Sequence, residues 1–211
     1  MNINNLPKNI SVFPLSDVVF FPKTILPLNI FEKRYIQLVN DSMKDQRLFG
    51  MIQPKKERRD QDVYEVGCLG KIINFNETGD GRFLINLSGI IRFRVKKELN
   101  SNKLYRKFEV DYSDFVSDLE LQKNNKNNHS EKNFLKKIKF FFNKNNYSVE
   151  FNELEKLNFD QLISAICMIS PFSPEEKQKL IETIKLDERL RVLEEIINFN
   201  ILDIQKNKTI Q

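Results

Sequence analysis

Three prolines divide the first part of the chain into short apolar runs. Pro14, Pro22 and Pro27 each stand within or at the end of such a run. Proline lacks a backbone N–H and disrupts the interior of a helix, whereas edge strands and turns tolerate it. The chain therefore cannot begin as a helical bundle, and the apolar runs predict strands at residues 10–15, 18–22 and 26–28.

The next segment changes to helical spacing. Asn29 followed by Glu32 has the form of a capping box, in which a side chain accepts from the first free backbone N–H groups of a helix. Apolar residues then recur at helical intervals through about Met43. We expect one helix here, beginning at Asn29.

Extended runs return between residues 48 and 112, separated by turn sequences. The strongest turn signal is the stretch 77–82, and Gly67 and Gly70 stand where a strand would bulge or bend. Many short strands with one inserted helix predict a closed or partly closed β-barrel. The expected strands are 48–52, 63–75, 83–87, 91–95 and 105–112.

The pattern changes again near Ser117. The stretch 122–133 is rich in Asn and Lys, which is typical of a linker, and apolar residues at helical spacing follow it. Ser173–Pro174 and Asp187 resemble helix starts. The sequence predicts an α+β chain with a β-barrel domain at 1–118, a polar linker at 119–133 and a helical bundle at 134–211.

Composition favours a globular protein. Hydrophobic residues make up 40% and charged residues 30%, and the net charge of +5 permits only weak attraction to nucleic acid or anionic membrane. No apolar stretch approaches the roughly 18–20 residues that a membrane span needs, and the N-terminus lacks a signal-peptide pattern. We expect a cytoplasmic protein without membrane contact.

Residues suited to catalysis or metal binding are scarce. His129, the one histidine, falls in the polar linker, where nothing would orient it. Cys68 and Cys167 stand far apart without a neighbouring Cys or His, which favours buried thiols over a zinc site or a disulfide. No phosphate-binding loop is present, since Gly70-Lys71 is followed by Ile72. We expect no catalytic residue, no metal and no cofactor; an enzyme would need perturbed carboxylates that converge in a deep pocket.

A basic stretch leaves nucleic-acid binding open as an alternative. Arg92 and Arg94 alternate with apolar residues on one predicted strand, and further basic residues follow at Lys96, Lys97, Arg106 and Lys107. A sheet face of this kind can track phosphates while aromatic rings stack on bases. Alternation also arises when one face of a strand is buried and the other is wet. RNA binding by the barrel therefore remains a second hypothesis.

Ordered motifs along nearly the whole chain resemble a known family. The opening motifs are 13–15, 18–22, 26–28 and 30–35, and the later ones are 66–72, 80–82, 89–93, 176–182 and Arg189. Together they resemble the N-terminal substrate-binding domain of the ATP-dependent Lon protease. The resemblance implies a PUA-like β pseudo-barrel with one inserted helix, followed by a C-terminal helical bundle. It also implies a stand-alone recognition domain without ATPase or peptidase domains.

The resemblance further implies a non-catalytic, polypeptide-binding function. Expected ligands are unfolded or damaged polypeptides with exposed apolar segments, or a protease or chaperone partner. We expect the contacts to be Phe20, Phe21 and Tyr35. Among the other motif residues, Phe31 and Phe93 are expected in the core, and a buried or half-buried ion-pair network is expected among Glu32, Arg34, Arg82 and Arg92.

Overall fold

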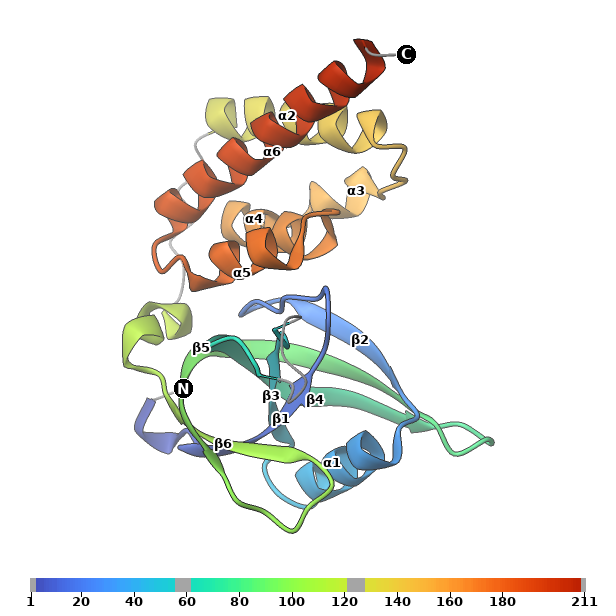
Figure 1. The fold of residues 1–211 in the computed structure, drawn as a ribbon, viewed down its shortest axis with the longest axis vertical. Helices are drawn as coiled ribbons and strands as arrows, with labels where there is room; N and C mark the ends of the chain where they lie inside the picture. Colours follow the sequence, from blue (N-terminus) through green and yellow to red (C-terminus); the bar gives the residue numbers. More distant parts are fainter. Residues whose placement is uncertain (1–2, 56–61, 121–127, 210–211) are drawn as a thin grey trace. The chain divides into compact units, whose positions relative to one another are not determined.

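The computed structural model describes residues 3–55, 62–120 and 128–209. The chain forms two compact units (Figure 1). The barrel unit comprises Met1–Glu120 and Ser173–Glu182, and the helical unit comprises Leu121–Phe172 and Thr183–Gln211. The predicted boundaries at 118 and 134 stay a prediction. Residues 121–127 of the predicted linker lie outside the described residues, and 128–133 begin a helix.

The barrel unit is built on a mixed sheet of six strands. In spatial order these are β2 (Ile25–Ile30), β5 (Phe83–Leu99), β4 (Val66–Glu77), β3 (Leu48–Ile52), β1 (Asn9–Pro14) and β6 (Arg106–Asp111). β1 and β3 are parallel, and the other pairs are antiparallel. β5 also pairs with β6, so the sheet nearly closes into a ring (Figure 1). The α+β prediction of a pseudo-barrel is confirmed.

β5 is a single strand of 17 residues, although the sequence predicted two strands separated at Gly89. Gly89 continues the ladder and exchanges backbone hydrogen bonds with Lys23 and Thr24, both at 2.9 Å. A β-carbon at this position would collide with the carbonyl of Phe21. Glycine therefore allows a loop to approach the middle of β5 without interrupting it.

That loop contains the predicted strand 18–22, and this prediction was wrong. The segment is irregular, and the chain takes left-handed backbone at both of its ends, with φ of 63° at Asp17 and 62° at Lys23. The side chains of Val19, Phe20 and Phe21 are buried in the barrel unit. The run is apolar because it fills the core, not because it joins the ladder.

The inserted helix α1 (Lys33–Met43) begins later than predicted. Asn29 is extended and pairs with Leu84, and the N-cap is Glu32, which makes no capping hydrogen bond with its side chain. Pairing of β2 with β5 through Ile30 overrides the local capping signal. α1 buries Tyr35, Leu38, Val39 and Ser42, and the ring of Tyr35 stacks on Phe13 with 3.9 Å between centroids.

Helix α5 (Pro174–Glu182) belongs to the barrel unit although it comes late in the sequence. The predicted helix start is confirmed: Ser173 and Glu176 exchange capping hydrogen bonds of 2.8 and 3.1 Å. Gln178 is buried and donates to the carbonyl of Val66, while Gln53 donates to Gln178. Lys177 donates to the carbonyl of Asp17 at 2.8 Å, and burial lowers the pKa of its ammonium group.

Within the barrel unit, residues 113–119 form the short 3-10 helix η2 (Ser113–Leu119), which follows β6 and buries Phe115. A second short 3-10 helix, η1 (Ile3–Asn5), precedes β1.

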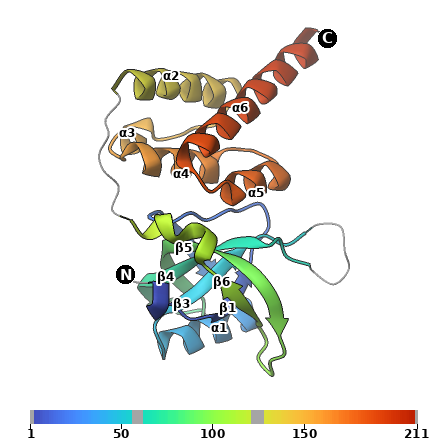
Figure 2. The same cartoon turned by 90° about the vertical axis from the view of Figure 1, so that its left-hand side faces the viewer.

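The helical unit contains α2 (Asn128–Lys144), α3 (Phe151–Leu154), α4 (Phe159–Ile169) and α6 (Leu186–Thr209), visible in Figure 2. Its core combines aliphatic side chains with several phenylalanines, which make edge contacts between Phe141 and Phe142 and between Phe134 and Phe159. Asp187 lies in the first turn of α6, so the prediction that it caps this helix was wrong. Among the helices that the structure describes, none has the length and apolar character needed to cross a bilayer.

Candidate functional site

The three aromatic residues predicted to bind polypeptide lie in the core of the barrel unit. Phe20, Phe21 and Tyr35 are 2%, 0% and 5% exposed. The hydroxyl of Tyr35 donates to the carbonyl of Pro14 at 3.4 Å, and burial raises its pKa. None of the three rings presents a surface to solvent in this structure, and their role in binding stays a prediction.

The charged motif residues do not form the predicted single network. Arg34 pairs with Glu32 at 2.8 Å, Arg82 pairs with Asp80, and Arg92 pairs with Asp118. Only the last pair is buried. The structure therefore separates these residues into three independent ion pairs, two of them on the surface.

The two motif phenylalanines differ. Phe93 is fully buried, as predicted, whereas Phe31 is 65% exposed and the prediction that it belongs to the core was wrong. Phe31 lies between the end of β2 and the start of α1. It adds an exposed aromatic ring next to the edge strand of the sheet.

Five of the six basic residues of β5 and β6 form ion pairs with acidic partners, and Lys107 is the exception within the described residues. Arg94 pairs with Asp114 at 3.0 Å, and Arg92 is buried against Asp118. The other surface pairs are Lys96–Asp111 at 3.3 Å, Lys97–Glu109 at 3.2 Å and Arg106–Glu98 at 2.7 Å. The basic stretch in the sequence is therefore part of a mixed-charge surface.

A different surface gathers exposed apolar side chains. β2, β5 and β4 form a three-stranded ribbon. Side chains alternate between more buried and more exposed positions along β2 and the first part of β5, whereas residues 73–77 of β4 are exposed throughout. The outward row of β2 is Ile25, Pro27 and Asn29; that of β5 is Leu84, Asn86 and Ser88; that of β4 is Lys71, Asn74 and Asn76. We call these nine residues the β2–β5–β4 face. Ile25 and Leu84 are 57% and 44% exposed.

Two shallow adjoining hollows lie on this ribbon. One of about 490 Å³ is bordered by Pro27 and Asn29 from β2, Leu84 and Asn86 from β5, and Asn74 and Asn76 from β4. The other, about 360 Å³, continues past Asn29 and Leu84 to the turn at Thr78–Arg82. The first hollow has no charged residue among its lining.

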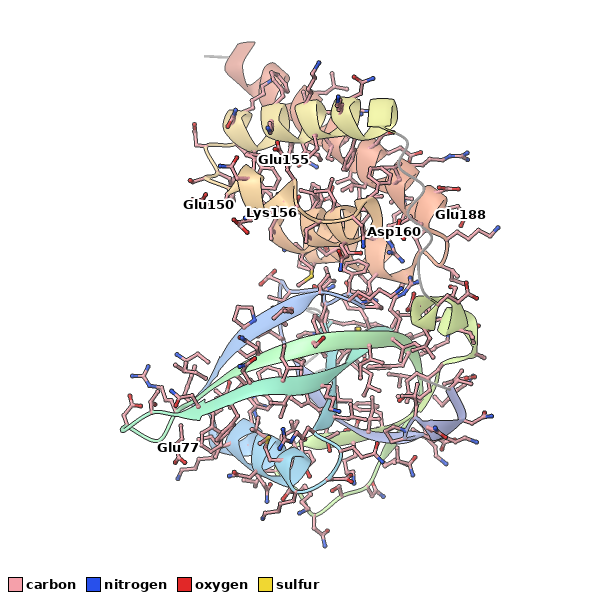
Figure 3. All side chains as sticks on the ribbon, turned by 180° about the vertical axis from the view of Figure 1, so that it is seen from behind. Glu77, Glu150, Glu155, Lys156, Asp160 and Glu188 are labelled. Carbon is pink, nitrogen blue, oxygen red and sulfur yellow. The ribbon has the colours of Figure 1, made fainter. Side chains whose placement is uncertain are left out.

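The turn that bounds the second hollow is held by its own side chains. Thr78 donates to Asp80 at 2.5 Å and to the carbonyl of Arg82 at 3.0 Å, and Arg82 pairs with Asp80. Hydrogen bonds from Arg82 and then Thr78 lower the pKa of Asp80. Figure 3 labels Glu77 at the end of β4, where this hairpin projects from the ring. The two charges at the turn therefore compensate each other.

The cysteines are buried and free. Burial raises the pKa of Cys68 well above its ordinary value and that of Cys167 to about 12, which suppresses thiolate formation. Within the described ranges, no three His, Cys, Asp or Glu side chains are grouped so that they could hold a metal ion.

Sequence reasoning missed Ile25, Pro27, Leu84 and the four asparagines of the β2–β5–β4 face. A signal was present in residues 83–87, where Phe, Ile and Leu alternate with Leu84 and Asn86. That alternation predicts that Leu84 is on the solvent side of the strand, but one exposed leucine is ordinary and does not by itself identify an interaction surface.

Known proteins resemble this chain in sequence. Residues 9–198 match the family described as the ATP-dependent protease La (LON) substrate-binding domain. The Lon protease of Syntrophus aciditrophicus (strain SB) is 26% identical over 222 residues, which cover 99% of this chain and 27% of that protein. Lon protease 2 of Myxococcus xanthus is 30% identical over 115 residues, 53% of this chain and 14% of that protein. The chain thus spans about a quarter or less of these relatives.

Solved structures share the fold. The N-terminal domain of Mycobacterium avium complex Lon protease aligns with a TM-score of 0.66 at 16% identity, covering 90% of this chain and 98% of that one. A Lon N-terminal domain protein from Xanthomonas campestris gives 0.62 at 20% identity, covering 88% and 96%. With the family match over residues 9–198, these findings show that the chain belongs to the family of the Lon substrate-binding domain.

Proposed function

We propose that this chain binds apolar segments of unfolded or damaged polypeptides on its β2–β5–β4 face. The observation that carries the proposal is the pair of adjoining hollows on this face, bordered by Pro27 and Leu84 and free of uncompensated charge. Membership of a substrate-binding family supports the same class of ligand.

The face suits weak, broad recognition. Ile25 and Leu84 are exposed on the same side of neighbouring strands, so covering them removes apolar surface from water. Each 100 Å² of apolar surface so covered is worth about 2.5 kcal/mol before ordering costs. Shallow hollows accept many side chains because their walls do not enclose the ligand.

RNA binding is the less supported alternative. A phosphate contact on β5 or β6 would have to compete with the acidic partners of Arg94, Lys96, Lys97 and Arg106. A protease or chaperone as an alternative binding partner, and a cytoplasmic location, are further parts of the proposal that rest on the family.

Salt dependence separates the two ligand classes. We would measure fluorescence anisotropy of a labelled, permanently unfolded protein titrated with this chain at low and high salt, with unlabelled RNA as competitor. Apolar capture predicts saturable binding with little salt dependence, which RNA does not displace. Phosphate recognition predicts affinity that falls steeply with salt. Binding that salt and RNA abolish would overturn the proposal.

A further inference from the structure

We propose that the β2–β5–β4 face holds its ligand as an extended, uncharged polypeptide and recognises the ligand's main chain through asparagine amides. This inference rests on the proposed function and specifies how the same surface reads its substrate. Four of the residues that border the larger hollow are asparagines: Asn29, Asn74, Asn76 and Asn86.

The strand register arranges these amides around the apolar side chains. Asn86 of β5 lies between Pro27 of β2 and Asn74 of β4 in one cross-strand row. In the adjacent row, Leu84 lies between Asn29 and Asn76. Side chains in a row lie close enough to contact a common ligand. Each apolar side chain of the two rows therefore has an amide beside it.

The four amides are available to a ligand. Within the described part of the chain, no hydrogen bond involves the side-chain amide of Asn29, Asn74, Asn76 or Asn86. Each amide offers two N–H donors and one carbonyl acceptor. A peptide group has one N–H donor and one C=O acceptor. An asparagine side chain can therefore accept from the peptide N–H or donate to the peptide C=O. A ligand carboxylate or ammonium would use only one kind of group.

Charge further restricts the ligand. Asp80 and Arg82 at the end of the hollows neutralise each other, and the lining of the larger hollow carries no charge. A charged ligand side chain would gain no opposite charge in the larger hollow, and contact with Pro27 and Leu84 would remove part of its hydration, which is unfavourable. The hollows therefore favour a segment of uncharged residues.

The spacing favours an extended ligand. Leu84 and Asn86 are two residues apart on β5, about 7 Å, which is the repeat of an extended chain and exceeds the pitch of an α-helix. An extended ligand lying along β5 would place main-chain peptide groups over the surface at every two-residue repeat. A helical segment would already satisfy its own peptide groups and leave the asparagines without a partner.

The test uses a labelled, uncharged peptide of valine, serine and glycine, and the same peptide with backbone N-methyl groups at alternate residues. N-methylation removes main-chain donors and leaves every side chain in place. We expect the methylated peptide to bind the wild-type protein roughly tenfold more weakly, since each lost hydrogen bond costs about threefold to tenfold. Equal affinity for the two peptides would overturn the inference and leave the proposed function standing. If the parent peptide failed to bind at all, both would fall.

Variants give an independent readout. Asn74→Leu with Asn86→Leu makes the face more apolar but removes two amides, so main-chain recognition predicts weaker binding of the parent peptide, by roughly tenfold or more. Apolar capture alone predicts unchanged or tighter binding, and that result would overturn the inference. Asn100→Leu with Asn102→Leu changes two exposed asparagines in the loop between β5 and β6 and should leave affinity unchanged. If the Asn74/Asn86 variant fails to fold, the methylated-peptide comparison on the wild-type protein decides the matter.

Discussion

The guanidinium group of Arg92 donates to both carboxylate oxygens of Asp118. Its Nε lies 2.9 Å from Oδ2 and its Nη2 lies 2.8 Å from Oδ1. A third donor, Nη1, reaches the carbonyl of Ile181 at 3.0 Å. Arg92 is only 1% exposed. Its hydrogen bonds link β5, η2 and the end of α5 inside the barrel unit.

Loss of this pair should destabilise the barrel unit. Arg92→Lys keeps the charge but cannot form two parallel hydrogen bonds to a carboxylate, and Asp118→Asn leaves the guanidinium buried without its counter-charge. We expect Asp118→Asn to lower the free energy of unfolding by about 3–5 kcal/mol and Arg92→Lys, which keeps both charges, by about 2–3 kcal/mol, measured by urea denaturation.

Arg94→Lys is the matched control, because Arg94 forms half-exposed pairs with Asp114 and Glu65 on the same strand. Its loss should be about 1 kcal/mol or less. Equal losses of unfolding free energy for Arg92→Lys and Arg94→Lys would contradict the role of Arg92 as the buried residue that links these elements.

Phe21 and Phe31 should respond in opposite ways to substitution. Phe21 is fully buried, so Phe21→Ala should cost about 3–5 kcal/mol of stability. Phe31→Ala removes an exposed ring and should leave the melting temperature nearly unchanged. Thermal unfolding followed by circular dichroism checks both. A Phe21→Ala protein that melts like the wild type would show that this ring is not part of the core.

Gly89 should not tolerate a β-carbon. Gly89→Ala would bring its methyl group against the carbonyl of Phe21, and the 17–24 loop would have to move away from β5. Gly79→Ala is the control, since a β-carbon there meets no atom within 4 Å. Only the first variant should melt at a lower temperature. If both melt alike, the loop does not press on β5.

Acid should weaken the contact between α1 and the loop before β6. Asp41 accepts from Lys103 at 2.9 Å and from Tyr105 at 2.8 Å, and these hydrogen bonds, that of Lys103 first, lower its pKa below 3.8. A carboxyl with a depressed folded-state pKa contributes stability that is complete above its unfolded pKa and is lost as pH falls through the folded value.

Urea denaturation at neutral pH and below pH 3.8 measures this contribution. The wild type should lose more stability between the two conditions than Asp41→Asn, which has no carboxyl to protonate at this site. Asp45→Asn removes a carboxylate two residues beyond the end of the same helix and should follow the wild type. Identical acid sensitivity in wild type and Asp41→Asn would contradict the prediction.

Much of the fold was predictable because local patterns and tertiary structure agree. Pro27 in the edge strand β2, the turn at Thr78–Arg82 and the cap at Ser173 all depend on a few neighbouring residues, and each is found as expected. Two of the failures have one cause in common. Asn29 resembles a helix cap, and 18–22 resembles a strand, but distant partners on β5 fix the conformation of both.

The candidate site was less predictable than the fold. Phe20 and Phe21 are aromatic residues near turns in the sequence, but in the structure their side chains are buried in the core. Only the cross-strand register shows that three residues from separate segments lie in one row: Asn29, Leu84 and Asn76. A single strand pattern carries no information on that register.

Binding of a labelled unfolded protein to Leu84→Asp, compared with Leu104→Asp, tests the central claim most directly. Leu84 lies on the central strand of the β2–β5–β4 face and borders both hollows, and Leu104 is an exposed leucine in the loop before β6, at 63% against 44% for Leu84. We expect Leu84→Asp to weaken binding by roughly tenfold or more, because a charge enters the larger, uncharged hollow, while Leu104→Asp should bind like the wild type. Equal affinity for both variants, with both folded, would show that polypeptides bind elsewhere on the chain.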